Sequence, residues 1–291
     1  MIVTEQAKDG PPVFMFIKLD EAPMRDHQPD AAMDILSKVP AVTLGFWIAK
    51  IFATTLGETG GDAVSMSWLG ETTPQAGANG LNGYLVGTLI FGVLLVVMIA
   101  LQIRAKRYNP WLYWGTIIAS TTAGTTLADF ADRSLGIGYL GGSTLLLMLV
   151  LASLATWKKV EGHVSSSHVV SGRAELFYWI TITFSQTLGT ALGDWAADTG
   201  GLGYLGGAAL FGGGIALVAA LYYFTSINRT ALFWAAFILT RPLGATVGDF
   251  LDKPIAKGGL DLSRPVATVA LLVALIATVA FTVRRERRAA T

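Results

Sequence analysis

Residues 47–62, WIAKIFATTLGETGGD, decide the fold, because the chain repeats their pattern four times. Each copy begins with a tryptophan, carries a glycine ten residues later and ends in an aspartate after fifteen. The copies align without gaps at residues 47–62, 114–129, 179–194 and 234–249. Such an internal repeat indicates one structural unit used four times.

The composition is typical of a membrane protein. Of the 291 residues, 53% are hydrophobic and 14% are charged, whereas about a quarter are charged in soluble domains. The net charge of +1 forms no basic stripe, so we expect no nucleic-acid partner. The absence of cysteine excludes disulfides and thiolate metal sites. The three histidines lie outside the apolar runs, and we interpret them as solvated loop residues: His27, His163 and His168.

Eight apolar segments are long enough to cross the ~30 Å hydrocarbon core as helices. They lie at about residues 41–66, 83–104, 111–131, 138–157, 174–197, 203–224, 231–252 and 264–283. They form four two-helix repeats in one transmembrane domain: about 41–104, 111–157, 174–224 and 231–283, within 41–283. We expect residues 1–40 to be a partly disordered cytoplasmic tail without a signal peptide, and residues 284–291 to be a basic cytoplasmic C-terminus.

Basic residues predict the orientation, because short cytoplasmic loops retain lysine and arginine. The connections on one side, together with the C-terminus, hold most of them: Arg104, Lys106, Arg107, Lys158, Lys159, Arg173, Arg229, Arg284, Arg285, Arg287 and Arg288. On the other side, Arg133, Lys253 and Lys257 are exceptions. We therefore predict a multi-pass protein of the bacterial inner membrane, surrounded by lipids, with both termini cytoplasmic.

Two helices per repeat bring every copy into the membrane in the same direction, so the repeats are parallel. The sequence predicts an all-α integral membrane protein whose repeats form a pseudo-fourfold ring or a 2+2 arrangement, with the second helices as scaffold. Fifteen helical residues place the aspartates about 22 Å from the tryptophans, in the outer half. We interpret the tryptophans as cytoplasmic interface anchors, and three tyrosines as the outer interfacial belt: Tyr84, Tyr139 and Tyr204.

Positions three, seven, eleven and fifteen after each tryptophan form a mostly polar stripe, because residues four apart share a helix face. The stripe reads Lys50, Thr54, Glu58 and Asp62 in copy one, Ile117, Thr121, Thr125 and Asp129 in copy two, Ile182, Gln186, Thr190 and Asp194 in copy three, and Phe237, Arg241, Ala245 and Asp249 in copy four. We expect it to face inward, since lipid does not solvate carboxylates or amides.

Five acids and two bases give this stripe three excess negative charges, which favours a cation or bound protons. We predict an ion-binding site whose metal ligands are Glu58, Asp62, Asp129, Asp194 and Asp249. The neighbouring polar residues of the site are Thr54, Thr121, Thr125, Gln186 and Thr190, and the charge partners are Lys50 and Arg241.

The glycines have two interpretations. Small residues four apart, such as Gly57 and Gly61, let helices approach closely, which is the role we expect. The alternative is a helix break that exposes carbonyl oxygens, with Gly60-Gly61 as its place. A second tier of acids is expected to be solvated helix ends, with an outer vestibule for cations as the alternative: Asp132, Asp198 and Asp252.

Four tandem two-helix units, each with a tryptophan and a glycine-rich stretch ending in aspartate, resemble a bacterial family of uncharacterised membrane-anchored proteins built from a repeat of unknown function. The resemblance covers residues 41–283, and residues 39–62, VPAVTLGFWIAKIFATTLGETGGD, carry it most specifically. It implies four two-helix repeats in a membrane and assigns no activity. A weaker likeness is to manganese or calcium transporters with a Glu-x-Gly-Asp motif, although residues 58–62, ETGGD, are one residue longer.

Function is expected to follow from the acidic stripe. We predict a secondary transporter that exports a hard divalent cation, Mn²⁺ or Mg²⁺, because such cations prefer oxygen ligands. Alternating protonation of the carboxylates would couple this movement to protons. The alternatives are a carrier of organic cations or amines, and a structural membrane protein whose buried ion pairs only hold helices in register. We expect no enzyme activity, and no cofactor other than a bound cation.

Overall fold

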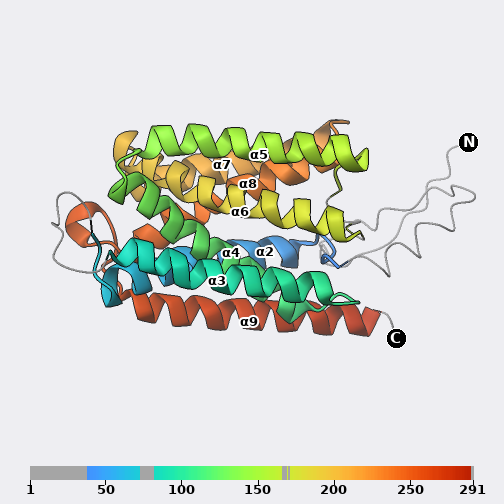
Figure 1. Ribbon diagram of the computed structural model, residues 1–291, viewed down its shortest axis with the longest axis horizontal. Coiled ribbons are helices and arrows are strands. Elements are labelled where there is room, and N and C mark those ends of the chain that lie inside the picture. The colour runs from blue at the N-terminus through green and yellow to red at the C-terminus, as the bar shows by residue number, and fades with distance from the viewer. Residues whose placement is uncertain (1–37, 73–81, 166–168, 170, 290–291) are drawn as a thin grey trace, which may run out of the picture.

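The computed structural model describes residues 38–72, 82–165, 169 and 171–289, and within them the chain forms eight long α-helices and no strand (Figure 1). The helices are α2 (Leu44–Asp62), α3 (Gly83–Arg104), α4 (Pro110–Asp129), α5 (Tyr139–Glu161), α6 (Gly172–Asp194), α7 (Gly203–Phe224), α8 (Arg229–Asp252) and α9 (Arg264–Ala289). They match the eight expected segments. Most of the expected N-terminal tail lies outside the described residues.

Capping side chains fix where several helices begin. Asn109 accepts hydrogen bonds from the backbone N–H groups of Trp111 and Leu112, and Pro110 occupies the first helical position of α4. Asparagine caps α3 and α8 in the same way. These caps satisfy backbone donors that the first turn leaves unpaired.

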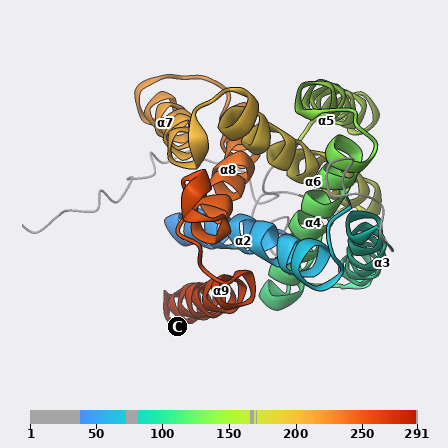
Figure 2. The same ribbon diagram turned by 90° about the vertical axis from the view of Figure 1, so that its left-hand side faces the viewer.

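The first helices of the four repeats form a closed ring (Figure 2). Helix α2 packs against α4, α4 against α6, α6 against α8, and α8 against α2. Each second helix lies outside and packs mainly on the first helix of the following repeat: α3 on α4, α5 on α6, α7 on α8, and α9 on α2. The backbone therefore adopts the pseudo-fourfold arrangement, and α9 closes it by packing against α2.

Glycines allow neighbouring inner helices to touch. A Cβ atom at Gly124 would lie only 2.9 Å from the backbone carbonyl carbon of Gln186. The same contact, between the tenth residue of one copy and the seventh of the next, recurs around the ring: Gly57 with Thr121, Gly124 with Gln186, Gly189 with Arg241, and Gly244 with Thr54. The packing role is confirmed. The alternative break at Gly60-Gly61 is wrong, because α2 continues to its aspartate.

Apolar side chains cover the outside of the bundle. Val93, Leu140, Leu205 and Val266, on the four outer helices, are each more than 60% exposed. Helices α3, α5, α7, α8 and α9 are long and apolar enough to cross a membrane. The chain is thus built as a membrane protein, with five of the eight expected spans supported by length and composition.

The tryptophans lie in an aromatic layer at one end of the inner ring. Trp114, Trp179 and Trp234 are at most 6% exposed. The ring of Trp179 packs against those of Tyr113 and Tyr178, with centroid distances of 5.7 and 5.3 Å. The prediction of interface anchors is therefore wrong for these three tryptophans, because they face neighbouring inner helices.

At the opposite end, the inner helices widen immediately after the repeat aspartate in three copies. Turns of π-helix follow α2, α4 and α6 at Ala63–Trp68, Phe130–Ser134 and Trp195–Thr199. Helix α8 instead continues as an α-helix to Asp252. Such π-turns are frequent at functional sites, and here they adjoin the carboxylates.

Candidate functional site

The polar stripe faces the centre of the ring. The sixteen residues at positions three, seven, eleven and fifteen after the tryptophans are all buried, and none is more than 3% exposed. All the site residues predicted from the sequence are among them. The inward direction of the stripe is therefore confirmed.

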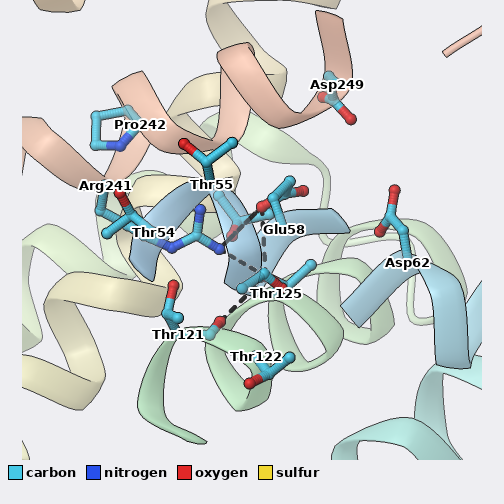
Figure 3. A network of polar contacts seen from close by, with 12 residues as sticks. Thr54, Thr55, Glu58, Asp62, Thr121, Thr122, Thr125, Arg241, Pro242 and Asp249 are labelled. Atoms are coloured by element: carbon cyan, nitrogen blue, oxygen red, sulfur yellow. Dashed lines mark hydrogen bonds and ion pairs between the residues drawn. The ribbon is translucent and has the colours of Figure 1, made fainter. Parts of the chain in front are cut away.

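Arg241 on α8 links the four inner helices (Figure 3). Its Nη2 lies 2.9 Å from Oε2 of Glu58 on α2. The same nitrogen donates to the hydroxyls of Thr125 on α4 and Thr190 on α6, at 2.6 and 2.5 Å. This is an ion pair inside the protein, where removing one charge leaves the other uncompensated.

Threonine hydroxyls complete this level of the ring. Those of Thr125 and Thr190 also lie 3.3 and 3.4 Å from Glu58 Oε2. Thr54, one turn away, donates to the backbone oxygen of Thr240 at 3.1 Å. The other predicted polar residues of the stripe have side-chain atoms without a hydrogen-bond partner in the described part of the chain: Lys50, Thr121 and Gln186.

Lys253, which directly follows α8, folds back onto three carboxylates. Its Nζ lies 2.6 Å from Asp62, 3.0 Å from Asp249 and 4.0 Å from Asp252. Arg264, at the start of α9, lies 3.6 Å from Asp252 and 4.0 Å from Asp62. Two bases, one at the end of α8 and one at the start of α9, therefore lie against the carboxylates of the ring.

Arg133, in the π-turn after α4, bridges the other two aspartates. Its Nε lies 2.8 Å from Asp129, one turn earlier, and its Nη2 lies 3.0 Å from Asp194 on α6. The four repeat aspartates thus divide into two bridged pairs, Asp129 with Asp194 and Asp62 with Asp249. The backbone ring is fourfold, but its charge network is twofold.

The predicted excess of three negative charges is wrong. Arg133, Lys253 and Arg264 lie against the same carboxylates and cancel that excess. Asp252, which faces two of these bases, restores one excess negative charge. Sequence reasoning treated Arg133 and Lys253 only as loop charges. The signal that identifies both is a base four residues after the aspartate, in copies two and four alone.

Two groups of three carboxylates lie close enough to share a cation. One oxygen from each of Glu58, Asp194 and Asp249 lies within 4.8 Å of the others. Asp62, Asp249 and Asp252 form a second such group. The structure therefore gathers four of the five predicted metal ligands into these groups and adds Asp252. Asp129 instead pairs with Arg133.

The second tier of acids and the tyrosine belt depart in part from expectation. Asp198 is exposed, as predicted for a solvated helix end. Asp132 is 7% exposed and packs against Gly142 of α5, and Asp252 is 5% exposed and faces loop bases. Tyr84 is fully buried rather than interfacial. These side chains are covered because the outer helices begin directly beside the ends of the inner ones.

A model of a known protein family matches each of the four repeats. The family model described as Repeat of Unknown Function (DUF347) matches residues 45–108, 112–163, 177–228 and 232–288, more than half of the chain. Each match combines one inner helix with the outer helix that follows it in sequence. A search of curated proteins and a search of solved structures each found no match.

Proposed function

We propose a function from the carboxylate site, since the chain belongs to the DUF347 repeat family, whose description names no activity. The protein is a membrane transporter that exports a hard divalent cation, Mn²⁺ or Mg²⁺. The supporting observation is the convergence of Glu58, Asp194 and Asp249, from three inner helices, with oxygens within 4.8 Å of one another. Such cations are bound by carboxylate oxygens.

Basic side chains that contact the three carboxylates can exchange with an entering cation. Each of its three carboxylates already holds a different cationic side chain: Glu58 with Arg241, Asp194 with Arg133, and Asp249 with Lys253. A divalent cation that enters displaces two of these three bases, so that the three carboxylates face three positive charges before and after binding. We interpret the structure as the resting state, in which tethered bases occupy the acidic centre.

The apolar outer helices and the basic loops support the membrane placement that we propose. We place all eight helices across the bacterial inner membrane, with both termini cytoplasmic. The less apolar α2, α4 and α6 belong to the inner ring, and outer helices pack against them. Lys253 and Arg133 are 9% and 23% exposed at the aspartate end, so the outer side offers the shorter path to the carboxylates.

The test is thermal unfolding of detergent-purified protein with Mn²⁺, Mg²⁺, Ca²⁺ or Zn²⁺, followed by flux in proteoliposomes. A cation that binds only the folded state raises the unfolding temperature. We expect Mn²⁺ or Mg²⁺ to stabilise the wild type, and Asp194→Asn to remove that stabilisation and the flux. Asp198→Asn is the matched control, because Asp198 lies four residues later and is exposed.

Equal responses of Asp194→Asn and Asp198→Asn would reject this cation site. If the Asp194→Asn protein folds poorly, Asp249→Asn repeats the test on another helix. Loss of folded protein in both variants, with no cation response in the wild type, would favour the structural alternative.

An organic cation or amine is the second candidate substrate. The supporting observation is the ammonium of Lys253, which three carboxylates already surround at 2.6, 3.0 and 4.0 Å. A site of this kind would bind a free alkylammonium ion through the same contacts between ammonium and carboxylates. Stabilisation and transport by methylammonium, with no response to divalent cations, would favour this candidate over metal export.

A further inference from the structure

A second set of buried polar groups lies between the carboxylates and the aromatic layer. It comprises Lys50 on α2, Thr121 on α4, Gln186 on α6 and Arg241 on α8, which we call the inner polar group, and each is 0% exposed. The last three occupy position seven of their copies, and Lys50 lies one turn nearer the tryptophans. All four inner helices therefore contribute to one region of the ring.

Most polar atoms of the inner polar group have no hydrogen-bond partner within the described residues. These atoms are Lys50 Nζ, Thr121 Oγ1, both amide atoms of Gln186, and Nε and Nη1 of Arg241. Only Nη2 of Arg241 is engaged, on the side of Glu58. In Figure 3 the Thr121 hydroxyl points toward the Arg241 side chain. Buried polar groups are otherwise almost always paired, so this concentration indicates a missing partner.

The charges of this region indicate the sign of that partner. With Lys50 protonated and Glu58 ionised, Lys50 and Arg241 bring two positive charges, and Glu58 brings one negative charge. Lys50 Nζ lies 4.0 Å from the ring centroid of Phe237, which compensates an ammonium only in part. One monovalent anion would make the region neutral. Water would satisfy hydrogen bonds there but would leave the charge.

We propose that the inner polar group is a binding site for a small monovalent anion, of the size of chloride, nitrate or formate. The Lys50 ammonium and the free donors of Arg241 supply the charge. The Gln186 amide and the Thr121 hydroxyl donate neutral hydrogen bonds. The glycine contacts at Gln186 and Arg241 hold these side chains between adjacent helices. This site goes beyond cation transport and shares only Arg241 with the ion pairs of the carboxylate site.

Arg241 joins the anion site to the carboxylates. An anion beside its free nitrogens weakens the hold of this guanidinium on Glu58, which then becomes available to a cation. Anion and divalent cation are therefore expected to raise each other's affinity by the same factor. This coupling rests on the proposed function, whereas anion binding does not.

The experiment measures thermal unfolding in potassium gluconate, chloride, nitrate or formate at one ionic strength, without divalent cations. Gluconate is the reference, because it is too large for a region enclosed by four helices. An anion at a hundred times its Kd should raise the unfolding temperature by about 5 °C relative to gluconate. Lys50→Met and Gln186→Leu should each abolish that rise.

Matched controls remove the same residue types elsewhere. Lys38→Met affects the lysine that pairs with Glu175, and Gln102→Leu affects a buried glutamine on the outer helix α3. Both controls should keep the anion response. Equal unfolding temperatures in all four salts, or a response that survives in both Lys50→Met and Gln186→Leu, would overturn the anion site. Because divalent cations are absent, neither outcome depends on the proposed transport of metal.

Discussion

The two halves of the inner ring are held by different forces. Toward the aspartates, carboxylates from all four helices are bridged by Arg133, Lys253 and Arg241. Toward the tryptophans, aromatic rings pack on one another with centroid distances of 5.3 to 5.7 Å around Trp179. Two of the three bridging bases lie just beyond the end of the repeated stretch, whereas the aromatic half is built around its first residue, the tryptophan. The acidic half is therefore the part of the ring whose balance of positive and negative charge can change.

Arg241→Met should have the largest effect on stability. It leaves Glu58 buried without its ion-pair partner, which costs about 3 to 5 kcal/mol. Thermal unfolding in detergent measures the loss. Arg229→Met, at the exposed start of the same helix, should change stability by less than about 0.5 kcal/mol.

A double variant separates charge from shape at this position. Glu58→Gln combined with Arg241→Met removes both charges and should recover part of the stability lost in the single variant. If the double variant is as unstable as Arg241→Met alone, the packing of Arg241 against Gly189 matters more than its ion pair. The acidic half would then be held by packing, like the aromatic half, and not by ion pairs.

Gly124→Ala tests the close packing at the middle of the ring, where the two halves meet. Its Cβ atom would lie 2.9 Å from backbone atoms of Gln186 and Thr187, which cannot rotate away. We expect a loss of about 1 to 3 kcal/mol in unfolding free energy, as for other overpacked interiors. Gly92→Ala in α3 meets nothing within 4 Å and should be neutral or slightly stabilising. Similar values for both variants would contradict the packing role.

The sequence predicts the ring better than the ion pairs. A fixed spacing of four identifies the buried face of each inner helix, and the repeat places those faces together. The tryptophan stands three residues before the stripe on that same face, so its burial could have been predicted as well. By contrast, Lys253 and Arg264 reach the carboxylates through a loop path that no periodic pattern specifies. The spacing of four residues predicts the contact of Arg133 with Asp129, one turn away. It does not predict the contact of Arg133 with Asp194 on the next helix.

The smallest expected effect lies in the aromatic half. The hydroxyls of Tyr113 and Tyr178 form a hydrogen bond of 2.7 Å, and both residues are at most 1% exposed. Either single change to phenylalanine leaves one hydroxyl unpaired and should cost about 1 kcal/mol in unfolding free energy. Tyr113→Phe with Tyr178→Phe removes both hydroxyls and should recover most of that loss. Additive losses in the double variant would mean that each hydroxyl acts through a separate partner, so that the aromatic half, like the acidic one, is held by specific polar contacts.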